Sequence, residues 1–141
     1  NRIIALDTET TGINKKRNGR SICDGHRIIE IGCVEIINGE ITGNVFHEYL
    51  QPDIPIDPKA EAVHGITTEF LKSKPRFKDV ATKFIQFIKN TTIIIHNAPF
   101  DISFIDQEFK QLPPSLQPQE TFEYIDTLTT QETYSQDTET T

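Results

Sequence analysis

The sequence of 141 residues predicts an α/β fold in which a mixed five-stranded sheet carries helices on its faces. Two short apolar runs, one ending at Leu6 and one at Ile95, give way abruptly to polar residues, as buried strands do at their ends. An Asn38-Gly39 pair stands between two further strand patterns and is the strongest short signal for a β-hairpin. The length fits one domain with a substantial core.

Each element has its own local signal. Partial alternation of apolar residues predicts a strand over 27–37, a partner strand over 40–50 and a last strand over 121–128 that ends near Asp126. Caps and apolar spacing predict the helices: Asp57-Pro58 begins one that Gly65 ends, and Asn97 begins another. The remaining expected elements are strands over 2–6 and 91–95, helices over 67–71, 76–89 and 98–112, an exposed basic loop over 14–25 and a polar, disordered tail over 129–141.

Composition limits the classes of function. The 21 acidic residues outnumber the 14 basic ones, and the net charge of −7 argues against capture of nucleic acid by a basic face. No apolar stretch reaches membrane-spanning length, and no signal segment precedes the first strand, so no membrane partner is expected. Cys23 and Cys33 lack a zinc-type spacing and are expected to be reduced thiols in a cytoplasmic protein. Because the sequence begins at Asn1 and has no Met, we expect it to lack at least its own start.

Asp7 and Glu9 are the first candidate functional pair. They follow the strand over 2–6, and residues i and i+2 of a strand point to the same face, so the two carboxylates project together. Two such carboxylates repel each other unless a cation lies between them, and Mg²⁺ or Mn²⁺ prefers oxygen ligands of this kind. The alternative is a strand end that runs into an acidic turn.

Asp101 is expected to join this pair. The strands over 2–6 and 91–95 are linked through helices and can be parallel neighbours, and the carboxyl ends of parallel strands are where open α/β sheets place their ligands. Asp7 and Glu9 would then lie beside His96, Asn97 and the helix that carries Asp101. Taken alone, Asp101 is equally explained as a carboxylate favoured near a helix N-terminus.

Four ordered motifs resemble those of the DEDDh 3′–5′ exonucleases. They are Asp7-Thr8-Glu9-Thr10-Thr11-Gly12, Ile29-Glu30-Ile31-Gly32, Val63-His64-Gly65-Ile66 and the run from His96 to Phe104, His-Asn-Ala-Pro-Phe-Asp-Ile-Ser-Phe. Within that family, the register over 2–128 is most similar to the proofreading, or epsilon, subunits of bacterial DNA polymerase III. The resemblance implies a ribonuclease-H-like fold.

The resemblance also implies a reaction and its residues. Asp7, Glu9 and Asp101 would be catalytic and would hold two divalent ions, Mg²⁺ or Mn²⁺, that hydrolyse the 3′-terminal phosphodiester. The residues implied to bind the substrate are Thr8, Glu9, Thr10, Thr11, His64, Asn97 and Phe100. Helix capping explains His64 equally well, capping and core packing do so for Asn97 and Phe100, and His96 is expected to be structural. The implied partners are a single-stranded DNA 3′ end and the alpha and theta subunits of DNA polymerase III.

The third motif of the family is not found. It needs a histidine general base and a fourth metal-binding aspartate on a later helix, and no histidine of this sequence lies after Asp101. We therefore expect an exonuclease domain over 1–128 that is incomplete at its C-terminal end, with its last helices missing. Two explanations stay open, a partial sequence and a decayed gene product. The alternative functions are an inactive remnant that docks on a polymerase and a related DEDDh ribonuclease.

Overall fold

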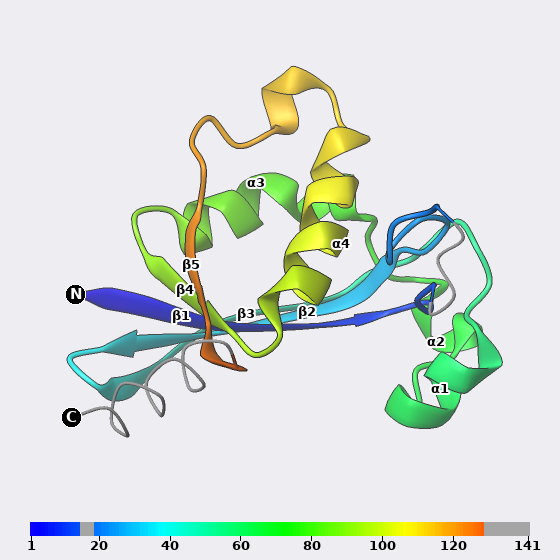
Figure 1. Cartoon of the computed structure of the whole chain (residues 1–141), viewed down its shortest axis with the longest axis horizontal. Helices are drawn as coiled ribbons and strands as arrows, with labels where there is room; N and C mark the ends of the chain where they lie inside the picture. Colours follow the sequence, from blue (N-terminus) through cyan, green and yellow to red (C-terminus); the bar gives the residue numbers. More distant parts are fainter. Residues whose placement is uncertain (15–18, 129–141) are drawn as a thin grey trace.

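A mixed five-stranded sheet forms the centre of the molecule, as the computed structural model of residues 1–14 and 19–128 shows (Figure 1). The strand order is β3-β2-β1-β4-β5. β1 pairs antiparallel with β2 and parallel with β4, and β4 pairs parallel with β5. The strands are β1 (Arg2–Thr10), β2 (Ile28–Ile37), β3 (Glu40–Tyr49), β4 (Thr92–Ile95) and β5 (Glu123–Asp126).

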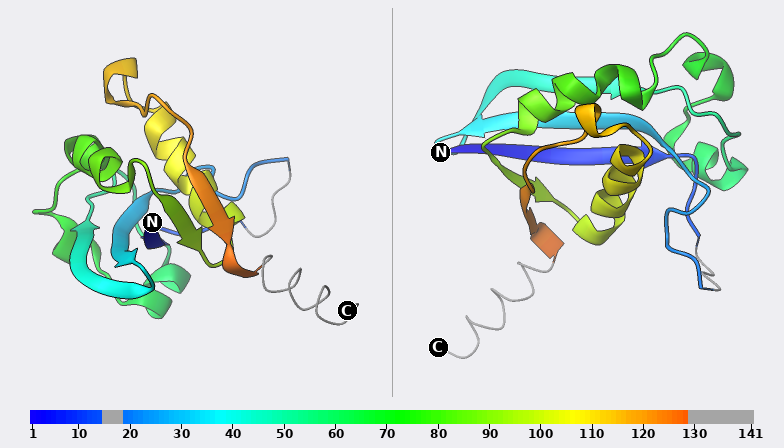
Figure 2. Two further views of the ribbon diagram at one scale, coloured as in Figure 1. Left: turned by 90° about the vertical axis from the view of Figure 1, so that its left-hand side faces the viewer. Right: turned by 90° about the horizontal axis from the view of Figure 1, so that it is seen from above.

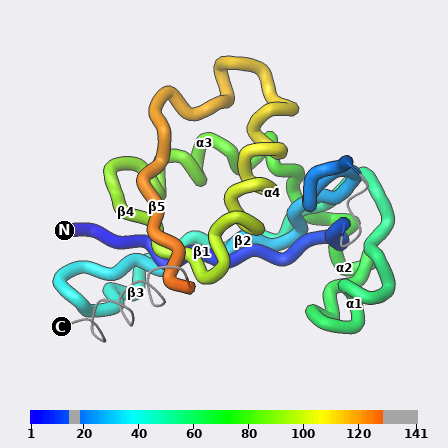
Figure 3. The backbone as a smooth tube through the Cα atoms, viewed as in Figure 1, coloured from blue at the N-terminus to red at the C-terminus, as the bar shows by residue number. Residues whose placement is uncertain are grey.

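Two pairs of helices flank this sheet in different places. The longer helices α3 and α4 lie over one face, and the short helices α1 and α2 lie together near the carboxyl end of β1 (Figures 1 and 2). The tube drawing in Figure 3 traces the crossover from β3 through α1, α2 and α3 to β4. The helices are α1 (Pro58–His64), α2 (Thr68–Leu71), α3 (Phe77–Ile88), α4 (Ala98–Lys110) and a 3₁₀ turn, η1 (Pro114–Leu116).

The main core lies between the sheet and the pair α3 and α4. Ile4 and Leu6 of β1 are buried there against phenylalanines of both helices. The Phe84 ring stacks on Phe109 at 6.2 Å between centroids, and Phe77 meets Phe109 edge to face at 5.0 Å. This layer of rings fixes α4 across the sheet and therefore fixes where its first turn lies.

The opposite face of the sheet carries the next residues in each strand. Asp7 pairs with Gly32 and Glu9 with Glu30, so these residues share a face, which we call the open face. Thr8 and Thr10 point instead to the side of α3 and α4 and are buried. A bulge between Glu9 and Thr10 follows, and bulges re-aim side chains at functional edges.

The hairpin prediction is confirmed, and the apolar residues of its second strand divide between the two faces of the sheet. Asn38 and Gly39 both have positive φ in the turn, as this hairpin signal requires. On β3, Phe46 is buried, whereas Ile41 is 72% and Val45 55% exposed. The reason is that β3 is the edge strand and its alternate residues lie on the open face.

The helix boundaries follow the predicted caps closely. Asp57 accepts a bond from the Lys59 backbone N–H at 2.9 Å, and Gly65 ends α1 with φ of 72°. Asn97 does precede α4, but it has φ of 65° and makes no side-chain capping bond. The observed helices end earlier than predicted, α3 at Ile88 and α4 at Lys110. The expectations for residues 15–18 and for the tail over 129–141 lie outside the described residues.

Candidate active site

β4 ends at Ile95 beside the middle of β1, which continues to Thr10 and so extends four residues beyond the predicted strand over 2–6; Asp7 and Glu9 therefore lie within the strand. Ala5 pairs with Ile94, so the residues after Ala5 and after Ile94 reach the same edge of the sheet. Asp7 there is exposed and Glu9 is half-buried. Burial and the charge of Asp7 both raise the pKa of the Glu9 carboxyl, and the neighbouring Glu30 adds to this effect. The negative charges of Asp7 and Glu9 therefore repel each other.

Asp101 reaches this edge from the first turn of α4. It is only 4% exposed, and the Thr8 hydroxyl donates a hydrogen bond to its Oδ1. Burial, together with smaller effects of Asp7 and Glu9, raises its pKa to about 6 despite that bond. Asp7 and Glu9 therefore lie close enough to Asp101 for their charges to disfavour its ionised form.

The three carboxylates do not yet form a closed ligand set. Within residues 1–14 and 19–128, no group of three His, Cys, Asp or Glu side chains is arranged to hold a metal ion. The physical reason is the pleat: Asp7 and Glu9 project from the open face, while Asp101 is bound to Thr8 of the buried face.

A divalent cation nevertheless fits the chemistry of these residues. Oxygen-only donors suit Mg²⁺ and Mn²⁺. A nearly buried carboxylate beside two others is costly when ionised, and a cation removes that cost. Asp101, Asp7 and Glu9 are therefore the residues that would hold it.

His64 is tied directly to the end of β1. Its Nδ1 accepts a hydrogen bond from the Ile66 backbone N–H at 3.0 Å, so the proton is on Nε2, which donates to the Thr10 carbonyl oxygen at 3.1 Å. His64 thus links the residue that follows the end of α1 to the end of β1.

Thr10, Thr11 and Gly12 turn the chain at the edge of the site. The Thr11 hydroxyl accepts from the Arg27 backbone N–H at 3.0 Å, and the Asp57 backbone N–H donates to the Thr11 carbonyl at 2.7 Å. Gly12 has φ of +154°, and a Cβ there would approach His26 to 2.7 Å. The turn therefore packs tightly against the start of α1, and the hydroxyls of Thr10 and Thr11 are engaged within the fold.

Asn97 and Phe100 stand at the start of α4, beside the site. The Asn97 side chain is exposed, and its backbone N–H donates to Asp126 Oδ1 at 2.9 Å. Phe100 is half-buried and packs on Phe104 with 5.0 Å between ring centroids, so it is at the margin of the predicted buried stripe. His96 is exposed, and its Nδ1 lies 3.2 Å from the Thr127 hydroxyl, in keeping with a structural role.

Sequence reasoning missed the ion pair that anchors α4. Glu108 is 1% exposed and accepts two bonds from the Arg27 guanidinium, at 2.7 and 2.9 Å, and one from the Ile28 backbone N–H at 3.0 Å. These groups are about 80 positions apart in the chain, so no local pattern links them. The only available signal was a glutamate on the predicted apolar side of the helix.

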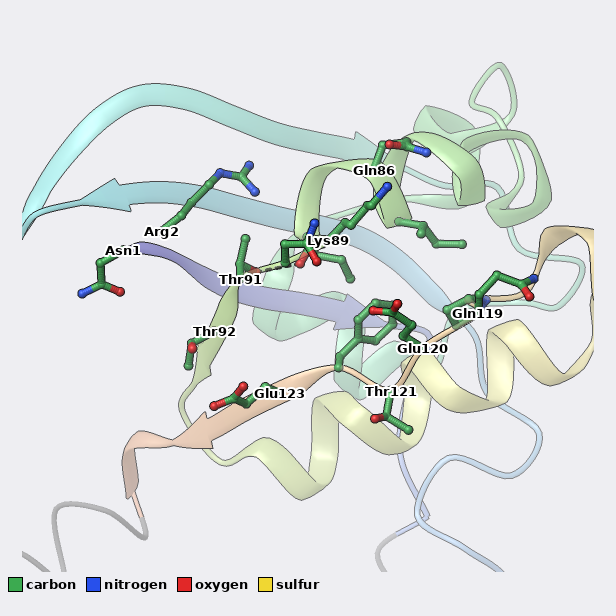
Figure 4. A pocket seen from close by; sticks show the side chains of 15 residues that line it. Asn1, Arg2, Gln86, Lys89, Thr91, Thr92, Gln119, Glu120, Thr121 and Glu123 are labelled. Carbon is green, nitrogen blue, oxygen red and sulfur yellow. Dashed lines mark hydrogen bonds between the residues drawn. The ribbon is translucent and has the colours of Figure 1, made fainter.

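A pocket lies at the other end of the parallel strands, away from these carboxylates (Figure 4). It is lined by Arg2 at the start of β1, Thr92 at the start of β4 and Glu123 at the start of β5. In an open α/β sheet, ligands bind beyond the carboxyl ends of the strands. This pocket is therefore not the candidate active site.

The fold and the carboxylates of β1 and α4 define a class, the α/β nucleases with acidic residues on a central strand and on a neighbouring helix. Comparison with known proteins makes this specific. The sequence model of the exonuclease (RNase_T) family matches residues 4–140, and the chain belongs to that family.

Relatives of high identity carry the name of a replication protein. The chain is 52% identical over 128 residues to the DNA polymerase III subunit epsilon of Buchnera aphidicola from Schizaphis graminum, covering 90% of this chain and 54% of that protein. It is 50% identical over 121 residues to the subunit of the same name from Escherichia coli K12, covering 86% and 49%. The chain thus spans about half the length of these relatives.

Solved exonucleases share the fold. Exonuclease X in complex with 5′-overhanging duplex DNA is 29% identical, with a TM-score of 0.62 over 89% of this chain and 59% of that one. Escherichia coli exonuclease I in complex with an oligonucleotide is 18% identical, with a TM-score of 0.73 over 92% and 29%. The predicted mixed five-stranded α/β fold of the ribonuclease-H-like exonucleases is confirmed.

Proposed function

We propose that this chain carries the catalytic part of a 3′–5′ DNA exonuclease that proofreads for a replicative polymerase of the DNA polymerase III type. The single observation that supports this most is the proximity of Asp7 and Glu9 of β1 to Asp101 of α4, beside the carboxyl end of β4. Membership of the exonuclease family and the epsilon relatives support the same reaction.

The cofactor we propose is a pair of divalent ions, Mg²⁺ or Mn²⁺. When bound, such ions supply an activated water and neutralise the charge that develops on the phosphodiester. Asp7, Glu9 and Asp101 would orient them, and the Thr8 hydroxyl would hold Asp101 in place until they bind. These side chains would contribute the positioning of the ions, and the positive charge would come from the ions themselves.

The substrate we propose is the 3′ end of single-stranded DNA. Thr8, Glu9, Thr10 and Thr11 would line the terminal nucleotide from β1, and Asn97 and Phe100 from the start of α4. His64 would act through its bond to the Thr10 carbonyl, which fixes the turn after the strand.

We infer the setting of the reaction from the relatives. The partners would be the alpha and theta subunits of DNA polymerase III, and the location would be the cytoplasm. No helix in the described ranges 1–14 and 19–128 is long and apolar enough to cross a bilayer, and Cys23 and Cys33 are both buried and free. The exonuclease domain would extend over 1–128, with 129–141 as a polar tail.

We propose that hydrolysis by this chain is slow because neither His64 nor His47 is free to act as a general base. In the described part of the chain, His64 uses both ring nitrogens within the fold, and His47 pairs with Glu30 at 2.5 Å. Loss of a general base commonly costs ~10²–10⁴-fold. We therefore expect slow hydrolysis from these 141 residues alone.

A single assay tests the reaction and its site. A 5′-labelled single-stranded DNA is incubated with the protein and Mg²⁺ or Mn²⁺, and we expect shortening from the 3′ end that Asp7→Ala abolishes. His96→Ala is the matched control, since His96 is exposed at the same edge and should keep activity. Equal shortening by the Asp7→Ala protein would overturn the site.

The same assay separates the two alternative functions. A related ribonuclease would shorten a single-stranded RNA of the same sequence in preference to DNA. An inactive docking module would bind no substrate and shorten neither strand with either metal.

A further inference from the structure

A row of side chains leads from the carboxylates of β1 across the open face to the edge of the sheet. The register pairs Glu9 with Glu30 and Glu30 with Tyr49. In the next row, Asp7 pairs with Gly32 and Gly32 with His47. Neighbouring strands are ~4.8 Å apart, so Tyr49 and His47 lie about 10 Å from the β1 carboxylates, measured across the sheet.

The surface of the sheet between β1 and β3 is not covered by a side chain at Gly32. Glycine presents no side chain, and a Cβ placed there would have only His47 Cδ2 nearby, at 4.0 Å. Glu30 would repel a phosphate, but its carboxylate is bound by His47 Nε2 at 2.5 Å. The surface between Asp7 and His47 is therefore open, and the Glu30 carboxylate beside it already has a hydrogen-bonding partner.

An aromatic cluster stands at the end of the row, made of His47 and Tyr49 of β3, Phe70 of α2 and Lys74. Tyr49 meets Phe70 edge to face at 4.9 Å between centroids and meets His47 at the same distance. The Lys74 ammonium lies 4.5 Å from the centre of the Phe70 ring.

The core does not account for Phe70. It is 45% exposed, and the residue that α2 buries is its neighbour Leu71. Leu71 packs with Ile29, Ile56 and Ile66, and Tyr49 covers this small cluster from outside. Phe70 thus exposes part of its aromatic ring to solvent, beside the Lys74 ammonium. It contacts Tyr49 of β3, which is two strands away from the carboxylates of β1.

We propose that this aromatic cluster is the subsite for bases upstream of the 3′-terminal nucleotide, so that single-stranded DNA runs from the carboxylates over Gly32 to Phe70. Aromatic side chains with a nearby cation bind single strands without sequence preference, because every base has a stacking face. Lys74 would meet the backbone phosphate there. The inference rests on the proposed exonuclease function.

Binding measured against substrate length tests the proposal. The affinity of the 141-residue protein for thymidine 5′-monophosphate, (dT)₂ and (dT)₆ is measured by competition against a fluorescein-labelled oligonucleotide, with Ca²⁺ in place of Mg²⁺ to prevent hydrolysis. We expect Phe70→Leu to weaken (dT)₆ about 5- to 150-fold, the range of one lost base stack, and to leave the mononucleotide unchanged.

Matched variants separate stacking from simple loss of apolar surface or charge. Ile41→Ala removes a more exposed apolar residue from the far end of β3 and should leave (dT)₆ binding unchanged. Lys74→Ala should weaken (dT)₆, whereas Lys72→Ala should not, because Lys72 is paired with Glu69 at 2.8 Å. Lys74 is not in the core, so its variant tests the proposal even where Phe70→Leu destabilises the fold.

The outcomes distinguish the two levels of inference. Mononucleotide binding with unaltered (dT)₆ affinity in both Phe70→Leu and Lys74→Ala would overturn the subsite and leave the exonuclease site intact. Failure to bind the mononucleotide and the oligonucleotides alike would overturn the proposed function and the subsite with it.

Discussion

At the scale of single residues, Asp101 combines burial with charge. Its pKa of about 6 lies above the ordinary value of 3.8, chiefly because burial disfavours the ionised form. Between these two pH values the unfolded chain loses its proton first, so ionisation favours unfolding as the pH rises. A difference of this size corresponds to about 3 kcal/mol of stability, which is present below pH ~4 and lost by pH ~7.

Asp101→Asn should therefore stabilise the protein while it abolishes activity. The amide oxygen can still accept the Thr8 hydroxyl bond, and the buried charge is gone. We expect the free energy of unfolding in urea to rise by about 1–3 kcal/mol at pH 7.5 and to change little at pH 4. An equal difference between variant and wild type at both pH values would show that the pKa of Asp101 is the same in the folded and unfolded states.

His64 is a second residue whose contacts give a direct expectation. Its ring joins the Ile66 N–H to the Thr10 carbonyl, so His64→Ala removes two hydrogen bonds that fix the end of β1. We expect a loss of about 1–3 kcal/mol of stability, measured by urea unfolding. His96→Ala serves as the control, because His96 is exposed and its Nδ1 lies within hydrogen-bonding distance of the Thr127 hydroxyl. An equal loss in both variants would contradict this role for His64.

At the scale of elements, α4 is held at both ends. Thr8 binds Asp101 in its first turn, and Arg27 binds Glu108 near its last turn. Gln107 adds bonds to the carbonyl oxygens of Cys23 and His26 at 3.0 and 2.8 Å. The helix is therefore fixed to the segment that joins β1 and β2. The turn at Thr10, Thr11 and Gly12 contacts the same segment, through the bond from the Arg27 backbone N–H to the Thr11 hydroxyl.

Removal of one partner of the buried ion pair should be costly. Glu108→Ala leaves the Arg27 guanidinium half-buried without its main acceptor, and we expect a loss of about 3–5 kcal/mol in urea unfolding. The double variant Arg27→Met, Glu108→Met should recover most of that loss, because no buried charge is left unpaired. If the double variant is as unstable as Glu108→Ala, the cost lies in packing rather than in charge.

The elements that sequence reasoning predicted correctly are those with local chemistry. Asp57, Gly65 and Thr67 cap their helices because capping involves residues two to four positions apart. Asn97 does not follow this capping rule, because its backbone has φ of 65°. Its backbone N–H donates instead to Asp126, which belongs to the distant strand β5. Local pattern therefore gave the helix start but not the conformation of the residue at that start.

Only the part of the candidate site that follows from the parallel pairing of β1 and β4 could be predicted from the sequence. The parallel pairing of β1 and β4 brings Asp7 and Asp101 to one edge, as the crossover suggested. The sequence held no signal that Asp101 would bind Thr8 across the pleat, or that Glu108 would clamp α4 from a fully buried position. Both features depend on contacts between residues about 80 to 90 positions apart, which three-dimensional packing alone decides.

At the scale of the whole molecule, the two faces of the sheet are unequal. Helices α3 and α4 bury one face, while the open face keeps Ile41, Val45 and Ile125 at least 42% exposed. Ile41 and Val45 belong to β3, an edge strand of ten residues. A long edge strand with exposed apolar side chains is a template for pairing with another chain.

We therefore expect the 141-residue protein to self-associate as its concentration rises, through the edge of β3. Val45→Lys places a charge in the middle of that edge and should shift the protein toward monomer in sedimentation velocity runs. Its stability in urea should stay within about 0.5 kcal/mol of wild type, as is usual for exposed positions. Val63→Lys is the matched control, since Val63 is 85% exposed on α1, away from β3, and should not alter association. Identical sedimentation of wild type and Val45→Lys across the concentration range would exclude the β3 edge as the contact.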